Sequence, residues 1–199
     1  DLRTSGWFYD HTRSFYLAHE PIVVFIHRAV PFIAAAFVAC CFLWLLLTWW
    51  RTKSMELKRY LPALYLLACC AIGPGIVVHN VMKDHFQRAR PSHSMEFGGA
   101  LKFTPAFAKA SECTHNCSFV SGHASIGFLF YSFAFIMPWA QRRRLILAVS
   151  TLLGSIIGLG RIIEGGHFLS DVVFAGFVVY FTCYFLYLFF VKFFDMEKI

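Results

Sequence analysis

Three short clusters of polar residues on an otherwise apolar chain carry the side chains needed for phosphoryl transfer. In chain order they are Lys83-(six residues)-Arg90-Pro91, Ser121-Gly122-His123 and Arg161-(five residues)-His167-(three residues)-Asp171. Three fixed cations and the backbone amides at a helix start can neutralise the oxygens of a phosphate group. One histidine can attack phosphorus while the other handles the proton of the leaving group. The clusters therefore predict phosphoryl transfer that needs no metal ion.

The third cluster is the most specific of the three. His167 and Asp171 are four residues apart, so one helical turn would place them on the same face. The carboxylate could then accept a proton from one imidazole nitrogen and leave the other as a free nucleophile. Arg161 lies near a predicted membrane boundary, where it should pair or bind an anion rather than face lipid. The alternative is a structural pair of Arg161 with Asp171, beside a histidine that takes no part.

The other two clusters also have simpler interpretations. Lys83 ends a predicted helix, and Arg90 would follow two turns later if the helix continued as far as Pro91. Such a segment could be only the basic flank of a membrane span. Ser121 is a good N-cap and Gly122 allows an anion to approach the backbone, yet this pair could serve the helix alone.

The elements that must position these clusters are membrane helices. The chain is 58% hydrophobic with 24 Phe, and only 15% of its residues are charged, far from the balance of a soluble protein. Several runs approach the roughly 20 apolar residues that cross a bilayer core. We expect five spans, the fourth being the weakest because it is short and contains Gly154 and Gly158. These expected spans are residues 29–50, 60–81, 124–140, 145–160 and 172–194.

The spans define an all-α, polytopic transmembrane bundle that forms one domain over residues 1–199. Residues 1–28 should form an N-terminal segment outside the membrane or at its interface, and residues 29–194 the core. The loop 83–120 should join two of the clusters outside the membrane. Because residue 1 is Asp rather than Met, a further span could precede it.

Alternating spans put all three clusters on one membrane face. The opposite face carries the basic loops, which are Arg51, Lys53, Lys58 and Arg59, and Arg142, Arg143 and Arg144. Short basic loops stay in the cytoplasm. The reactive face should therefore be extracytoplasmic, which is the periplasm for the inner membrane of a Gram-negative cell. The net charge of +7 is split between the two faces, which favours lipid headgroups over nucleic acid as partners.

Cys113 and Cys117 lie in the loop on the reactive face. An oxidising compartment would allow them to pair, although C-x3-C pairing requires a tight local turn. Two free thiols, or metal ligands together with His115, are the alternatives.

The remaining histidines give no metal motif. The chain has nine His, but neither H-x3-H nor H-E-x-x-H spacing occurs, so we expect no metal site and no cofactor. We expect His11, His19 and His27 to take no part in the chemistry. His79 could line the site, but a structural role is the stronger expectation.

The ordered triple of clusters resembles the type 2 phosphatidic acid phosphatase superfamily of lipid phosphatases, from about residue 60 to 194. Two positions depart from the family pattern, because Val120 stands where Pro is common and Gly160 where Ser is common. The resemblance implies that His167 is the nucleophile, that Asp171 orients it, and that His123 protonates the leaving oxygen and then activates water. The phosphate ligands that it implies are Lys83, Arg90, Ser121, Gly122 and Arg161. It also implies six spans, and so one before residue 1.

Three further stretches are similar to the lipid A 4'-phosphatase branch of this superfamily. They are Ile72-Gly73-Pro74-Gly75-Ile76-Val77-Val78, Asn116-Cys117-Ser118-Phe119-Val120 and Gly165-Gly166-His167-Phe168. The segment Phe8-Tyr9-Asp10 also looks like the region that precedes a span in that branch. These matches are weaker than the three clusters, since proteins of one fold often differ in substrate.

These observations predict an integral membrane enzyme that removes phosphate from a phospholipid or glycolipid, with lipid A at the 4' position as the expected substrate. Undecaprenyl pyrophosphate, phosphatidylglycerophosphate, and transfer of the phosphoryl group to a second lipid are alternatives within the same chemistry. A transporter that binds an anion without chemistry is the alternative outside it.

Overall fold

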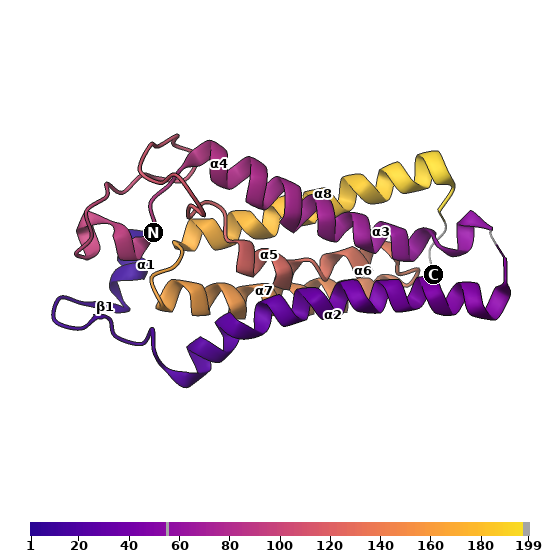
Figure 1. Ribbon diagram of the computed structural model, residues 1–199, viewed down its shortest axis with the longest axis horizontal. Coiled ribbons are helices and arrows are strands. Elements are labelled where there is room, and N and C mark those ends of the chain that lie inside the picture. Colours follow the sequence, from indigo (N-terminus) through magenta and orange to yellow (C-terminus); the bar gives the residue numbers. More distant parts are fainter. Residues whose placement is uncertain (55, 197–199) are drawn as a thin grey trace.

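The computed structural model describes residues 1–54 and 56–196, and it is mostly helical with almost no strand. Figure 1 shows the helices running side by side along one long axis. Within the described chain, four helical segments are long and apolar enough to cross a membrane. They are α2 (Pro21–Thr52), the segment Leu61–His93, α7 (Ala140–Ile163) and α8 (Leu169–Phe194). An all-α membrane bundle is thus confirmed.

The expected span 124–140 corresponds to a shorter apolar helical stretch, Gly122–Ile136, that is interrupted once. The chain there forms two short helices, α5 (Gly122–Phe128) and α6 (Tyr131–Ile136), of seven and six residues. Both lie among the longer helices, in contact with α7 and α8. A backbone break at membrane depth is tolerated where protein rather than lipid surrounds it. The fourth expected span, thought the weakest, is instead the long helix α7.

Glycines allow α5 to pack closely on α7. A methyl group on Gly127 would lie 2.6 Å from the Cα of Gly154, and one on Gly154 would lie 2.3 Å from the ring of Phe128. A methyl group on Gly158 would likewise clash with the side chain of Val172 of α8. Small residues four apart let membrane helices approach this closely. The two glycines that weakened the prediction of this span are therefore its packing surface.

We expect Gly127→Ala to destabilise the bundle by about 1–3 kcal/mol, because its new methyl group would meet backbone atoms that cannot turn aside. Thermal unfolding in detergent would measure this as a lower melting temperature. Gly73→Ala is the matched control, since a methyl group there would meet only Thr182, at an ordinary 3.7 Å. Equal melting temperatures for both variants would contradict this account of the packing.

The second long helical segment changes its geometry before it reaches the first cluster. Within Leu61–His93, the continuous helix consists of α3 (Leu61–Cys70), the π-helix η2 (Ala71–Met82) and one turn of α-helix, α4 (Lys83–Phe86). Gln87 follows in the left-handed conformation, with φ of 49°. The helix therefore ends before Arg90, which reaches the site from a loop and not from a helix two turns beyond Lys83.

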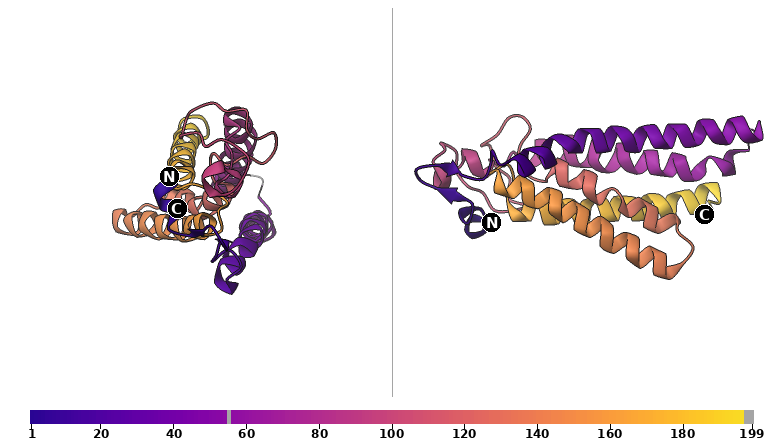
Figure 2. Two further views of the ribbon diagram at one scale, coloured as in Figure 1. Left: turned by 90° about the vertical axis from the view of Figure 1, so that its left-hand side faces the viewer. Right: turned by 90° about the horizontal axis from the view of Figure 1, so that it is seen from below.

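The N-terminal segment packs beside the loops at one end of the bundle. It comprises α1 (Leu2–Gly6) and a hairpin of β1 (Tyr9–Asp10) and β2 (Ser14–Phe15), which pair in antiparallel register. Phe15 forms a small aromatic core with Phe97 and Phe168. Figure 2 shows this end lying opposite the C-terminus.

Three short 3₁₀ turns complete the fold, namely η1 (Leu57–Arg59), η3 (Pro91–His93) and η4 (Met95–Phe97). The turns η3 and η4 belong to the loop that covers the end of the bundle where the N-terminal segment packs. The starts of α5 and α8 and the end of α7 face this same end (Figure 1). All three predicted clusters therefore converge there.

Candidate active site

His167 lies in the tight turn between α7 and α8. Gly165 has a φ of 70°, and the amides of Gly166 and His167 both donate to the carbonyl of Arg161, at 2.9 and 3.2 Å. A side chain at Gly165 would meet Phe15, whose ring lies 2.5 Å from the position of such a Cβ. The turn is thus held from inside by its own hydrogen bonds and from outside by the N-terminal hairpin.

His167 and Asp171 come together, but not on one face of a helix. α8 begins only at Leu169, and Asp171 in its first turn reaches back to accept from the amide of Phe168 at 2.7 Å. The same carboxylate oxygen lies 3.5 Å from His167 Nδ1 and accepts from the Ser118 hydroxyl at 2.5 Å. Nδ1 thus faces the carboxylate, and Nε2 is the nitrogen left for a reaction.

Burial lowers the pKa of His167 to about 3, and the positive charges of Arg161 and Lys83 oppose protonation further, while Asp171 acts in the other direction. The imidazole is therefore uncharged at neutral pH. A neutral ring with its proton on Nδ1 has a lone pair on Nε2, the form that a nucleophilic histidine needs.

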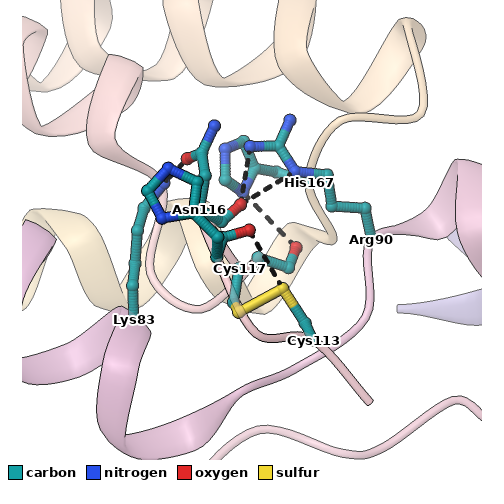
Figure 3. The surroundings of a disulfide bond; sticks show 8 residues. Lys83, Arg90, Cys113, Asn116, Cys117 and His167 are labelled. Atoms are coloured by element: carbon teal, nitrogen blue, oxygen red, sulfur yellow. Dashed lines mark hydrogen bonds between the residues drawn. A yellow bond between two sulfur atoms is a disulfide. The ribbon is translucent and has the colours of Figure 1, made fainter.

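The cations of the first cluster converge on the loop residue Asn116. Lys83 Nζ donates to the Asn116 side-chain oxygen at 2.8 Å, and Arg90 Nη2 donates to the Asn116 carbonyl at 2.9 Å. Figure 3 shows the two cations reaching Asn116 from different sides, with His167 close by. Asn116 is uncharged, so it leaves the positive charge of both cations for an anion to neutralise.

Arg161 faces a different set of partners. It contacts Glu164 in an ion pair, and its Nη1 lies 2.9 Å from His27 Nδ1. His27 Nδ1 is also 3.1 Å from the second oxygen of Glu164. Arg161 Nε is buried without a hydrogen-bond partner in the described structure. His27, for which no part in the chemistry was expected, is brought onto Arg161 by α2 and so lies at the edge of the site.

The second cluster starts α5 as expected. The hydroxyl of Ser121 accepts from the amide of Ala124 at 3.4 Å, and the amide of Ser121 donates to the carbonyl of Asp171 at 3.0 Å. The ring of His123 lies edge-on to His27, with 4.7 Å between centroids. A methyl group on Gly122 would come within 2.9 Å of the His79 ring, so His79 also borders the site.

A cavity of about 490 Å³ opens beside these groups. Its walls include Arg90, Asn116, Arg161, Glu164 and His27. It is large enough for a phosphate group with part of the molecule that carries it.

The loop that carries Asn116 is closed by a disulfide between Cys113 and Cys117 (Figure 3). Asn116 itself adopts a left-handed conformation, with φ of 51°. In the described residues 1–54 and 56–196, no three His, Cys, Asp or Glu side chains are grouped to hold a metal ion.

Sequence reasoning assigned no role in the site to five residues that the structure places there: Arg88, Asn116, Ser118, His27 and Glu164. Arg88 and Ser118 are buried beside Asp171. Their signal in the sequence was only their closeness to the first two clusters. His27 is far away in sequence, and only the packing of α2 against α5 and α7 reveals it.

Comparison with known proteins agrees with this site. The family model of the PAP2 superfamily matches residues 62–195. The chain is 35% identical over 94% of its length to a lipid A 4'-phosphatase of Francisella tularensis subsp. novicida (strain U112), of which it covers 84%. It is 40% identical over 53% of its length to a lipid A 4'-phosphatase of Rhizobium etli, of which it covers 41%. The corresponding enzyme of Rhizobium leguminosarum is also 40% identical, over 54% of the chain and 46% of its own length. No solved structure matches the chain.

Proposed function

Starting from the fact that the chain belongs to the PAP2 superfamily, we propose that it is a lipid A 4'-phosphatase acting at the periplasmic face of a bacterial inner membrane. Membership of this family supports a phosphatase rather than the anion transporter considered above. The long apolar helices of the chain make it a multi-pass membrane protein. Support for lipid A comes from the Francisella enzyme, whose similarity covers 94% of the chain, including the N-terminal segment or most of it.

In the proposed reaction, Nε2 of His167 attacks phosphorus, and the bond from phosphorus to the sugar oxygen breaks. His123 gives its proton to that oxygen, and a phosphohistidine remains on His167. His123 then takes a proton from a water molecule, which attacks phosphorus and releases inorganic phosphate.

The charge that develops on the phosphate oxygens is stabilised by groups already in place. Lys83, Arg90 and Arg161 bind these oxygens, and the Ser121 hydroxyl and the Gly122 amide add neutral donors. The observation that carries the proposal is the pairing of His167 Nδ1 with Asp171, 3.5 Å apart, beside Lys83 and Arg90, two cations that are held by the uncharged Asn116.

The test is to express the protein in a Gram-negative host and to analyse its lipid A by mass spectrometry. We expect lipid A to lose one phosphate, and fragmentation to place the loss on the distal sugar. His167→Ala expressed at the same level is the control and should leave lipid A unchanged. Intact lipid A, together with rapid hydrolysis of undecaprenyl pyrophosphate by the purified protein, would reassign the substrate and leave the chemistry in place.

The periplasmic orientation makes a separate prediction for the thiols of the 113–117 loop. In intact cells with a permeabilised outer membrane, a maleimide that cannot cross the inner membrane should label the protein only after reduction, because the disulfide blocks both thiols. The Cys113→Ser/Cys117→Ser double variant gives the background from the other cysteines. Labelling that appears only when the inner membrane is also opened would place the loop in the cytoplasm and contradict the orientation.

A further inference from the structure

We propose that Arg88 is a positioning residue for this reaction, holding Asp171 ionised and aimed at His167. The inference rests on the proposed function, because it concerns the same histidine nucleophile. Arg88 occupies one of the six unspecified positions between Lys83 and Arg90, and it pairs with Asp171 rather than with Asn116, which holds the other two cations.

Every nitrogen of the Arg88 side chain has a partner. Nη1 donates to Asp171 Oδ1 at 2.5 Å and to the Ser170 hydroxyl at 2.9 Å, and Nε donates to the carbonyl of Thr104 at 2.7 Å. Nη2 donates to Asp1 Oδ2 at 2.9 Å. The side chain is 1% exposed. With four of its five N–H groups bonded and the side chain buried, this guanidinium is not available as a phosphate ligand, so its effect passes through Asp171.

Aromatic rings fix the plane of this guanidinium. Its central carbon lies 4.3 Å from the ring centre of Phe168 and 5.4 Å from that of Phe103. Stacking on aromatic rings is a property of arginine that lysine shares only in part. The orientation of the Arg88 guanidinium toward Asp171 is therefore fixed, as well as its position.

The charge of Arg88 matters because Asp171 is fully buried. The groups in contact with its carboxylate are Arg88 on Oδ1 and, on Oδ2, the Ser118 hydroxyl, the Phe168 amide and His167. Of these, only Arg88 carries a positive charge while His167 is neutral. The cations Lys83 and Arg90 also act on Asp171, but from a distance and while bound to Asn116.

A buried carboxylate that loses its cation takes up a proton at neutral pH. A protonated Asp171 would donate a hydrogen bond to His167 Nδ1 instead of accepting one. The imidazole proton would then sit on Nε2, where it blocks the lone pair that attacks phosphorus. Arg88 thereby sets the tautomer of the nucleophile without touching the substrate.

The N-terminal segment takes part in the same arrangement. Asp1 accepts from the Ser170 amide at 2.8 Å and from the Ser170 hydroxyl at 2.7 Å, beside its pair with Arg88. Asp1 therefore binds Nη2 of the guanidinium while Asp171 binds Nη1. The N-terminal segment lies outside the residues matched by the family model, 62–195.

The test compares Arg88→Met, which removes the charge and keeps much of the volume, with Arg88→Lys, which keeps the charge. We expect Arg88→Met to lower kcat by about 10³–10⁴-fold at neutral pH, as expected for a nucleophilic site with the wrong histidine tautomer. KM should stay within about threefold, because no phosphate ligand is lost. The deficit should shrink as the pH rises and Asp171 ionises, whereas Arg88→Lys should lose less activity and keep the wild-type pH profile.

A second measurement does not depend on activity. Nitrogen-15 spectra of histidine-labelled protein, with the His167 signals identified by their loss in His167→Gln, report which ring nitrogen carries the proton. We expect the proton on Nδ1 in the wild type and on Nε2 in Arg88→Met. An unchanged tautomer in a folded Arg88→Met protein would overturn the inference, as would a loss of kcat that is the same at every pH. A protein that hydrolyses no phosphorylated lipid, yet changes tautomer as expected, would refute the proposed function and not the role of Arg88.

Discussion

Replacing His167 with alanine should abolish turnover, with a loss of at least about 10⁴-fold, because the proposed covalent intermediate forms on this side chain. The wild type, quenched in acid-free denaturant during turnover, should carry an alkali-stable phosphoryl group, and the variant should carry none. Radiolabelled phosphate from the substrate would measure this difference directly.

His85→Ala is the matched control for this experiment. His85 is exposed on α4, close to the site in sequence but outside the cavity wall. It should retain wild-type turnover and the phosphoryl group. A correctly folded His167→Ala protein with near-normal turnover would end the case for a phosphohistidine.

His123→Ala should behave differently, because the proposed mechanism has His123 act on protons in both halves of the reaction. With a lipid substrate the loss should be about 10²–10⁴-fold, since the leaving oxygen departs unprotonated. With an aryl phosphate, whose leaving group needs no proton, the first half should proceed and the second should stall. Phosphoenzyme would then accumulate in His123→Ala, and rapid-quench labelling should detect a burst followed by slow turnover.

His79→Ala provides the comparison, because His79 borders the same helix start without facing His27. It should show neither the burst nor the stalled second half. A His123→Ala protein that loses the first half with an aryl phosphate would instead assign His123 to binding the phosphate.

Hydropathy predicted the long helices well and the short ones poorly, for one physical reason. A helix that faces lipid must be apolar over about 20 residues, so composition alone predicts α2 and α8, whereas α7 was predicted only in part, as residues 145–160. The stretch from α5 to α6 is equally apolar, but its neighbours are protein helices. Composition does not distinguish these two surroundings, and the break after Phe128 therefore could not be predicted.

The site shows the same division. The side chains of the three clusters were predicted because their chemistry is visible in residue type and spacing, and the structure brings them together, although their roles stay predictions. The pairing of His167 with Asp171 was expected from helical spacing, yet it arises from the helix start at Leu169. Arg88 and His27 could not be assigned to the site from the sequence. Each lies beside a membrane span, and a residue in that position has the same sequence context whether or not its side chain faces the site.

The continuous helix that leads to Lys83 limits how the chain can change in length. A residue added to or removed from a helix turns everything beyond it, by about 100° in an α-helix. η2 lies between the packed helix α3 and Lys83, which is 3% exposed and points into the site. An insertion or deletion of one residue in Ala71–Met82 would thus turn Lys83 away from Asn116, whereas the surface loop before Cys113 could vary in length at little cost. Length variation among functional relatives of this chain should therefore fall in that loop and spare the helix before Lys83.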